Sequence, residues 1–217
     1  MSNENRKTLA AYNTTAQIYL DNTITHDKRC PQHALNKKKQ LANNLKRAFN
    51  TIPTGAKILE IGSADGENAK ILESLGFDVA ASDVAPAFLA ACKKQGLKTI
   101  KLDVLEDDLP SKLYGVLCWR VFVHFTPNDI KLALRRIYDA LLPNGRLLFN
   151  VIDNATHDCN EEWMDFGGEY EMGVKRYFAY YSKDEIIKII KDTKFKMIFD
   201  WYEHGGHNDW FCFVLEK

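Results

Sequence analysis

The strongest constraint on the fold is a regular alternation, from residue 57 onward, of short apolar segments with stretches of helical length. Strands are predicted for the apolar segments at residues 57–62, 77–83, 99–103, 113–119 and 146–152. Helices are predicted between them at residues 66–75, 86–96 and 127–142. Strands that alternate with helices and are apolar on both faces form a parallel sheet with right-handed crossovers.

Other patterns flank this alternating region. Residues 31–50 predict a helix, because apolar side chains recur there every four positions. Residues 195–203 and 209–216 predict a hairpin around a Gly-Gly loop, and residues 183–193 a helix before it. We therefore expect an α/β, Rossmann-like doubly wound fold. It comprises a mostly parallel seven-stranded sheet, helices on both faces and an antiparallel C-terminal hairpin strand.

The length of 217 residues predicts a single domain. Its expected parts are an N-terminal helical cap, a central core, an insert, and a last helix with the hairpin, at residues 1–54, 55–152, 153–182 and 183–217. The insert is rich in aromatic residues, and residues 153–171 hold seven acids and no lysine or arginine.

Composition excludes several classes of protein. The 29 basic and 29 acidic residues cancel, which argues against a dedicated nucleic-acid-binding protein, although residues 1–50 carry nine basic and only three acidic side chains. The five cysteines form no C-x-x-C pair, so neither a disulfide framework nor a metal site is predicted. A polar N-terminal region and the lack of a long apolar run predict a cytoplasmic protein that does not contact membranes. We expect a monomer or a homodimer.

The loop after the first predicted strand, Glu60-Ile-Gly-Ser-Ala-Asp-Gly66, carries the most specific signal. Small residues where a strand meets a helix let a ligand approach backbone amides closely. The glycine spacing fits neither the dinucleotide fingerprint nor the phosphate-binding loop. Asp83 and Asp103 end the next two predicted strands, where parallel sheets bind ligands. A carboxylate at Asp83 can accept both hydroxyls of a ribose, and Asp103 could reach an adenine edge.

With these residues the chain resembles the class I S-adenosylmethionine-dependent methyltransferases, over roughly residues 55–217. The resemblance implies S-adenosylmethionine as cofactor and S-adenosylhomocysteine as product. It implies an acid-x-Gly-x-Gly-x-Gly loop, a ribose-binding and an adenine-binding acid, residues after the fourth strand beside the methionine part, and an N-terminal tyrosine over the cofactor. The cofactor-binding residues expected on this basis are Tyr19, Glu60, Gly62, Ser63, Ala64, Gly66, Asp83, Val84, Asp103, Val104, Trp119 and Arg120.

Two positions depart from the family pattern. Ala64 replaces a glycine, which is tolerated if the backbone there is not at positive φ. Gly115 stands where the fourth strand often carries an acid. Neither position is expected to contact the ribose or the adenine.

The predicted function is methyl transfer to nitrogen or oxygen of a small molecule. His124, just beyond the fourth predicted strand, is the candidate catalytic base. Tyr177 and Tyr181 of the insert, together with His207, are the candidate substrate contacts. The acids of the insert favour a neutral or cationic acceptor over an anionic one, and make a nucleic-acid partner improbable.

Three alternatives stay open on the sequence alone. An RNA or protein methyltransferase could use the basic residues 37–39 for docking. A non-catalytic protein with the same fold could bind the cofactor without turnover, although the intact Asp83 and Asp103 argue against it. A dehydrogenase is disfavoured by the spacing of the glycine loop.

Overall fold

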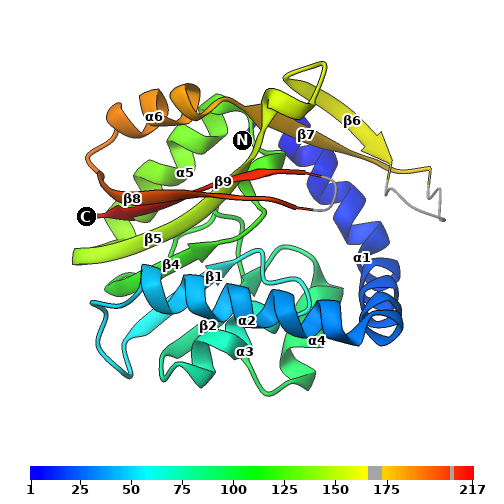
Figure 1. The fold of residues 1–217 in the computed structure, drawn as a ribbon, viewed down its shortest axis with the longest axis horizontal. Helices are drawn as coiled ribbons and strands as arrows, with labels where there is room; N and C mark the ends of the chain where they lie inside the picture. The colour runs from blue at the N-terminus through cyan, green and yellow to red at the C-terminus, as the bar shows by residue number, and fades with distance from the viewer. Residues whose placement is uncertain (166–172, 206–207) are drawn as a thin grey trace.

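One mixed sheet organises the structure, a computed structural model that describes residues 1–165, 173–205 and 208–217, with residues 24–29 described by their backbone alone (Figure 1). Within these ranges the sheet has nine strands. Seven of them follow the order β3-β2-β1-β4-β5-β7-β6, and the other two lie off this path, with β9 paired to β5 and to β8. The strands are β1 (Lys57–Ile61), β2 (Asp78–Asp83), β3 (Lys98–Lys101), β4 (Leu113–Cys118), β5 (Leu141–Asp153), β6 (Glu161–Asp165), β7 (Lys175–Tyr181), β8 (Lys196–Glu203) and β9 (Trp210–Glu216). The run from β3 to β5 is parallel and β9 is antiparallel, which confirms the predicted fold class.

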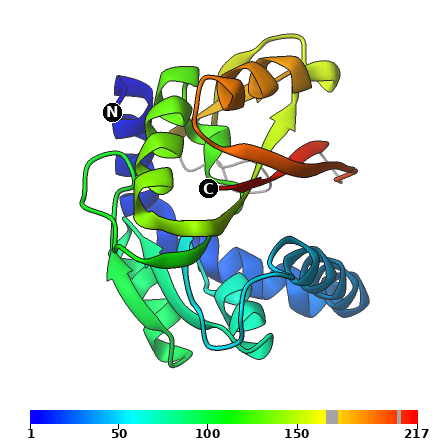
Figure 2. The same cartoon turned by 90° about the vertical axis from the view of Figure 1, so that its left-hand side faces the viewer.

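Helices cover both faces of the sheet, as Figures 1 and 2 show. The described helices are α1 (Asn3–Arg29), α2 (Pro31–Ala48), α3 (Glu67–Ser74), α4 (Pro86–Lys94), α5 (Pro127–Ala140) and α6 (Lys183–Lys191), with short 3-10 turns η1 (Phe122–His124) and η2 (Asn154–Thr156). One apolar core joins α5 and α6 to the sheet. A second core joins α2, α3 and α4 to the opposite face.

The strand order reverses between β1 and β4, and this reversal places the site. From β1 the chain moves outward to β2 and β3, and then returns to β4 on the other side of β1. Crossover loops diverge at such a point, so a cleft forms at the carboxyl ends of the strands. The long helix α1 lies beside this edge of the sheet (Figure 1).

The segment 153–182, for which the sequence predicts an insert and no strands, contributes two strands to the sheet. It contains β6 and β7, an antiparallel hairpin whose second strand extends the main sheet where Ile152 of β5 pairs with Tyr180. The aromatic side chains of β7 are the reason, because Tyr177, Tyr180 and Tyr181 are almost completely buried. Residues 166–172 of this segment lie outside the described residues.

Residues 143–145, which lie between the predicted helix 127–142 and the predicted strand 146–152, fall within the bounds of β5, which begins at Leu141. Asn144 has a φ of 63°, and the register of β5 against β4 shifts between the pairs Leu113–Leu141 and Gly115–Arg146. This connection is therefore a bulge within the strand, and pairing resumes beyond it.

Close packing around β4 explains why position 115 is a glycine. A Cβ atom there would lie 3.0 Å from Cε1 of Phe49, the residue that ends α2, and 3.2 Å from Cγ1 of Ile58. The aromatic ring of Phe49 is buried and fills the space beside β4. An acid at this position would displace that ring and place an unpaired charge in the core.

We predict that Gly115→Asp lowers the free energy of unfolding by roughly 3 kcal/mol or more, because the carboxylate would be buried without a partner. Gly115→Ala is the control for steric crowding alone, with an expected loss of about 1–3 kcal/mol. Urea unfolding at neutral pH measures both variants. Equal stability of Gly115→Asp and the wild type would show that the ring of Phe49 does not restrict this position.

Candidate functional site

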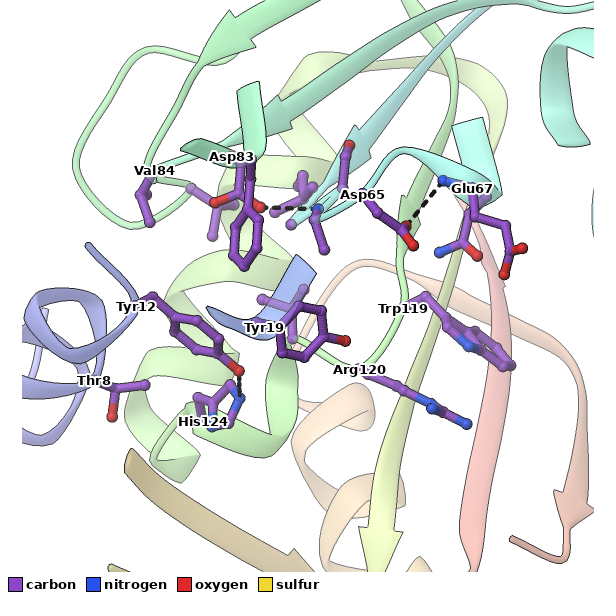
Figure 3. A pocket seen from close by; sticks show the side chains of 18 of the residues that line it. Thr8, Tyr12, Tyr19, Asp65, Glu67, Asp83, Val84, Trp119, Arg120 and His124 are labelled. Carbon is purple, nitrogen blue, oxygen red and sulfur yellow. Dashed lines mark hydrogen bonds between the residues drawn. The ribbon is translucent and has the colours of Figure 1, made fainter. Parts of the chain in front are cut away.

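A cavity of about 290 Å³ lies at the carboxyl ends of β1, β2 and β4 and beneath α1 (Figure 3). Of the twelve residues expected to bind a cofactor, all except Glu60 and Gly66 line it, and so does His124. The walls also include residues of α1 and α2 that the sequence analysis did not single out. Sequence positions from 5 to 203 thus meet around one cavity.

The glycine loop adopts a conformation that two of its residues can reach only as glycine. Gly62 has a φ of 71°, and a Cβ atom there would lie 2.4 Å from Cγ2 of Val121. Gly66 has a φ of 82°, and its Cβ would lie 2.6 Å from Cδ1 of Leu97. The lack of a side chain at Gly62 lets Val121 pack directly against the loop backbone. In the same way, Gly66 lets Leu97 pack directly against the start of α3.

Ala64 corrects the sequence-based expectation, because its φ of 46° lies in the left-handed region. This conformation costs an alanine roughly 1–2 kcal/mol. The Ala64 N–H donates to Oδ2 of Asp83 over 3.1 Å, and the thiol of Cys92 donates to its carbonyl over 3.5 Å. These bonds hold the peptide groups on both sides of Ala64 despite the strain.

Asp83 connects the loop to β2. Its Oδ1 accepts from the Ala85 N–H over 3.0 Å, and its Oδ2 accepts from Ala64, as the dashed line in Figure 3 shows. The side chain is buried, and desolvation raises its pKa, while the backbone hydrogen bonds act in the opposite direction. A carboxylate has about four lone-pair positions, so two of them can still accept hydrogen bonds from a ligand.

Glu60 lies beneath the loop instead of in the cavity wall. It is fully buried, and its Oε1 accepts from Nδ2 of Asn68 over 2.8 Å. No donor among the described residues lies within hydrogen-bond reach of its Oε2. Burial raises the pKa of Glu60 to about 7. Asn68 does line the cavity, so Glu60 acts on the site through this amide.

The end of β3 forms another part of the wall. Asp103 and Val104 follow this strand and face the cavity together with Val84, which follows β2. Oδ1 of Asp103 accepts from the Leu105 N–H over 2.9 Å, which fixes the carboxylate. Desolvation raises the pKa of Asp103. A carboxylate between two valines suits a flat ligand that has an apolar face and a hydrogen-bond donor at its edge.

Trp119 and Arg120 line the cavity after β4. The φ of Arg120 is 60°, and its N–H donates to Oδ1 of Asn150 over 2.6 Å. The guanidinium carbon lies 4.9 Å from the ring centroid of Trp210, in a cation–π arrangement. Backbone and side chain of Arg120 are therefore both held, and Figure 3 shows it beside Trp119 at the cavity.

His124 belongs to a directed chain of hydrogen bonds. Its Nδ1 lies 2.7 Å from the carbonyl oxygen of Tyr177, so Nδ1 carries the proton. Its Nε2 lies 2.9 Å from the hydroxyl of Tyr12 and accepts from it, and Nη1 of Arg176 donates to the same hydroxyl over 2.8 Å. Burial, together with the nearby charge of Arg176, lowers the pKa of His124 to about 3. The imidazole is therefore neutral across the physiological range of pH.

Two aromatic residues of α1 cover the cavity. Tyr19 packs edge-on against Phe88 of α4, with ring centroids 5.5 Å apart, and Tyr12 lies 6.1 Å from the same ring. Burial raises the pKa of Tyr19 to about 12, so its hydroxyl stays protonated. The spacing of seven residues between Tyr12 and Tyr19 is the sequence signal that places both on one helix face.

The structure does not place the candidate substrate tyrosines at the cavity. The hydroxyl of Tyr177 donates to Glu161, and that of Tyr181 donates to the carbonyl oxygen of Phe125. Both side chains are buried in the core that contains α5 and α6. His207, the third candidate, lies outside the described residues.

Several lining residues have no obvious sequence signal. Asn5 and Thr8 of α1 and Lys37 and Gln40 of α2 reach the cavity from helices that precede the sheet. Their contribution depends on how α1 and α2 pack across the edge of the sheet, which local periodicity does not specify. Polar residues on the inward face of α1 are the one local sign that this helix borders a cavity, because a solvated helix carries its polar residues on the outward face.

A glycine loop, two spaced aspartates and a covered cavity meet at the switch point, which is where open α/β sheets bind their ligands. The particular family follows from sequence. Residues 32–198 match the family described as methyltransferase domain. This match spans well over half of the chain, so the protein belongs to that family. A search of the curated proteins finds no match.

Solved structures of methyltransferases share the fold. Magnesium protoporphyrin IX methyltransferase from Synechocystis PCC 6803 superposes with a TM-score of 0.73 at 11% identity, covering 100% of this chain and 98% of its own. The 1,6-didemethyltoxoflavin-N1-methyltransferase of Burkholderia thailandensis gives 0.65 at 16% identity, covering 94% and 89%. The N-methyltransferase NodS of Bradyrhizobium japonicum gives 0.62 at 16%, covering 84% and 86%. Identities this low show a common fold and leave the substrate open.

In the part of the chain that the structure describes, no group of three or more histidine, cysteine, aspartate or glutamate side chains is arranged to hold a metal ion. Within the same residues, no helix is both long and apolar enough to cross a bilayer.

The raised pKa of Glu60 predicts a pH dependence of stability. The folded-state pKa of about 7 exceeds the ordinary value of 4.5, so folding favours the protonated form. Stability is therefore lost as pH rises from about 4.5 through about 7. Between pH 5.5 and 8 the contribution amounts to about 2 kcal/mol. Urea unfolding of Glu60→Gln, which keeps an acceptor for Asn68, should lack this component.

Glu106→Gln, an exposed glutamate, serves as the matched control and should retain the wild-type dependence. His124 contributes a pH dependence of the opposite sign, because its lowered pKa decreases stability as pH falls below about 6.5. This contribution is present in wild type and variant alike, so the difference between their two profiles reports Glu60 alone. An identical pH profile for Glu60→Gln and wild type would show that Glu60 ionises as an ordinary carboxyl group.

Proposed function

We propose that the protein transfers a methyl group from S-adenosylmethionine to nitrogen or oxygen of a small molecule, with S-adenosylhomocysteine as product. The observation that carries the proposal is that the glycine loop, Asp83, Asp103 and Trp119 line one cavity in a member of the methyltransferase domain family. Structures with this fold include enzymes named as N-methyltransferases, which supports a nitrogen acceptor among the options.

Several residues that line the cavity suit this cofactor chemically. Asp83 keeps two acceptor positions for the ribose hydroxyls after its two backbone hydrogen bonds. Val84 and Val104 offer apolar surfaces for an adenine ring. The space beside Gly62 is filled by Val121, so the loop backbone and this side chain form one close-packed wall of the cavity. Arg120 provides a fixed positive charge for a carboxylate at the opposite part of the cavity.

The bound cofactor would supply an electrophilic methyl group on a sulfonium. The protein's own residues then have to align the acceptor and exclude water. Tyr19 and Phe88 form an aromatic cover, and their packing keeps α1 close to the cavity. Such burial raises the strength of each electrostatic interaction beneath the helix.

His124 serves this mechanism by holding Tyr12. The imidazole cannot accept a proton readily, because its pKa is about 3 and its Nε2 is already bonded to the hydroxyl of Tyr12. Its Nδ1 is anchored on the backbone of β7, and Arg176 fixes the hydroxyl from another side. We infer that this chain orients the hydroxyl of Tyr12 at the cavity. A neutral amine or hydroxyl acceptor would take the methyl group and become cationic, and the methylated acceptor would then release its proton to solvent.

The charges around the cavity favour a neutral or cationic acceptor. Five acidic residues line the cavity against two basic ones: Asp65, Glu67, Asp83, Asp103 and Glu203 against Lys37 and Arg120. Since His124 is neutral, the wall is negative overall. A negative wall of low dielectric attracts cations and repels anionic molecules such as RNA. A small molecule remains the acceptor class that this cavity supports.

Isothermal titration with S-adenosylhomocysteine tests the cofactor. Wild-type protein should bind, and Asp83→Ala should bind at least about 10-fold more weakly, because hydrogen bonds to a charged group contribute about 1.5–3 kcal/mol. Asp139→Ala removes an exposed acid of α5 and should bind as the wild type does. Absence of binding to wild type would overturn the proposed function.

Turnover with a methyl-labelled donor, measured on a panel of neutral and cationic amines and alcohols, tests Tyr12. Tyr12→Phe should lower kcat about 10- to 100-fold through misalignment and leave cofactor affinity within about 2-fold. His124→Ala should do the same, and the double variant should show no further loss, because both act through one chain. Tyr138→Phe, on α5, is the control. Undiminished turnover in Tyr12→Phe would end this assignment.

A further inference from the structure

We propose that Glu203, at the end of β8, determines acceptor specificity by binding a positively charged group of the small molecule. This group is separate from the atom that receives the methyl. The inference rests on the proposed function, because it assumes that the cavity holds a methyl acceptor beside the cofactor. It narrows the acceptor class from neutral or cationic molecules to those that carry an ammonium or guanidinium group.

Glu203 reaches the cavity from the side of the sheet opposite to Asp83 and Asp103. Beyond β4 the sheet continues with β5, β9 and β8, whereas β2 and β3 lie on the other side of β1. Glu203 ends β8, and the two aspartates follow or end β3 and β2, so they meet the cavity from opposite sides of the switch point. Figure 3 shows the same separation, with Val84 on the left and Trp119 on the right. A group bound by Glu203 therefore lies away from the part of the cavity proposed for the ribose and the adenine.

Both the backbone and the side chain of Glu203 are held. Its backbone pairs with that of Trp210 in the last pair of the hairpin. Its Oε2 accepts from Nδ2 of Asn44 in α2 over 3.3 Å. Asn44 continues the face of α2 that carries Lys37 and Leu41, which line the cavity seven and three positions before it. The carboxylate is thus positioned where α2 and the hairpin meet at the cavity wall.

The carboxylate of Glu203 keeps acceptor capacity for a ligand. The amide of Asn44 is neutral and occupies Oε2 alone. Among the residues that the structure describes, no cation forms an ion pair with Glu203, and no donor bonds its Oε1. The other carboxylates of the wall accept from backbone amides or pair with a lysine: Asp65, Asp83, Asp103 and Glu67. Glu203 is partly exposed, so its Oε1 can exchange water for a ligand.

Two cationic residues also line the cavity, and neither neutralises Glu203. The guanidinium carbon of Arg120 lies 4.9 Å from the ring centroid of Trp210, and its proposed ligand is the carboxylate of the cofactor. Lys37 is exposed, so solvent screens its charge. Trp119 lines the same cavity and offers an aromatic face. A carboxylate and an aromatic face are the two kinds of group that bind organic cations.

The cation bound by Glu203 cannot be the nucleophile, because an ammonium group has no lone pair. The reacting amine or hydroxyl must be a second, neutral group of the same molecule. Its lone pair forms the bond to the methyl carbon, the bond from this carbon to sulfur breaks, and the electron pair stays on sulfur. The methylated group then releases a proton to solvent. The acceptor therefore has two polar groups, one held by Glu203 and the other aligned beside Tyr12.

Binding of three matched compounds to the full chain, saturated with S-adenosylhomocysteine, tests the proposal. The compounds are 1,5-diaminopentane, 5-aminopentan-1-ol and 5-aminopentanoate, which differ in the charge of one terminal group. Ligand-observed NMR titration measures their affinities without turnover. Wild type should bind the diamine about 10-fold more tightly than the amino alcohol, as expected for one charge-assisted hydrogen bond, and the amino carboxylate most weakly. Glu203→Gln, which keeps an acceptor for Asn44, should bind the diamine and the amino alcohol equally. Glu203→Lys should favour the amino carboxylate.

Glu106→Gln is the matched control, since Glu106 is exposed and does not line the cavity. It should keep the wild-type order of affinities. In Glu203→Gln the affinity for S-adenosylhomocysteine should stay within about 2-fold of wild type. A larger loss would place the ligand of Glu203 on the cofactor and overturn the proposal. Equal binding of the diamine and the amino alcohol to wild type, or no binding of the diamine, would overturn it too. Failure of the wild type to bind S-adenosylhomocysteine would instead overturn the proposed function, and this proposal with it.

Discussion

The carboxylate of Asp83 is the interaction on which the rest of the site depends. It bonds the N–H of Ala64 in the loop after β1 and the N–H of Ala85 before α4. Three segments are thereby held at one edge of the sheet. The loop needs this restraint, because Ala64 has a left-handed conformation that an alanine does not adopt without cost. Hydrogen bonds within the protein thus hold the loop after β1 in the strained conformation that forms the cavity wall.

Helix α1, which covers the cavity, is held by different kinds of interaction at its two ends. Near its start, α1 is held by polar contacts, from Thr8 to the backbone of β7 and from Tyr12 to His124. Further along, Ala16 and Leu20 pack with Phe88 in an apolar cluster. Directional bonds fix the rotation of the helix, whereas apolar packing fixes its distance from the cavity. Together they explain how a helix of weak amphipathicity covers the site.

Local patterns predicted the parallel core and the part of the cavity wall formed by the ends of the strands, because alternating periodicity and loop spacing are properties of neighbouring residues. Gly62, Asp83 and Asp103 could be found in this way, since the carboxyl ends of adjacent parallel strands must meet. The hairpin of β6 and β7 could not, because the burial of Tyr177 depends on packing against distant elements. Asn5 could not either, since an inward-facing asparagine is recognised only when its surroundings are known.

One helix therefore contributes to the cavity wall along most of its length. Lining residues occur in α1 from Asn5 to Thr23, and 27 residues of helix span about 40 Å. Backbone hydrogen bonds keep these residues at fixed spacings along the helix. The contacts of α1 with β7 and α4 therefore position all of them together over the carboxyl ends of the strands.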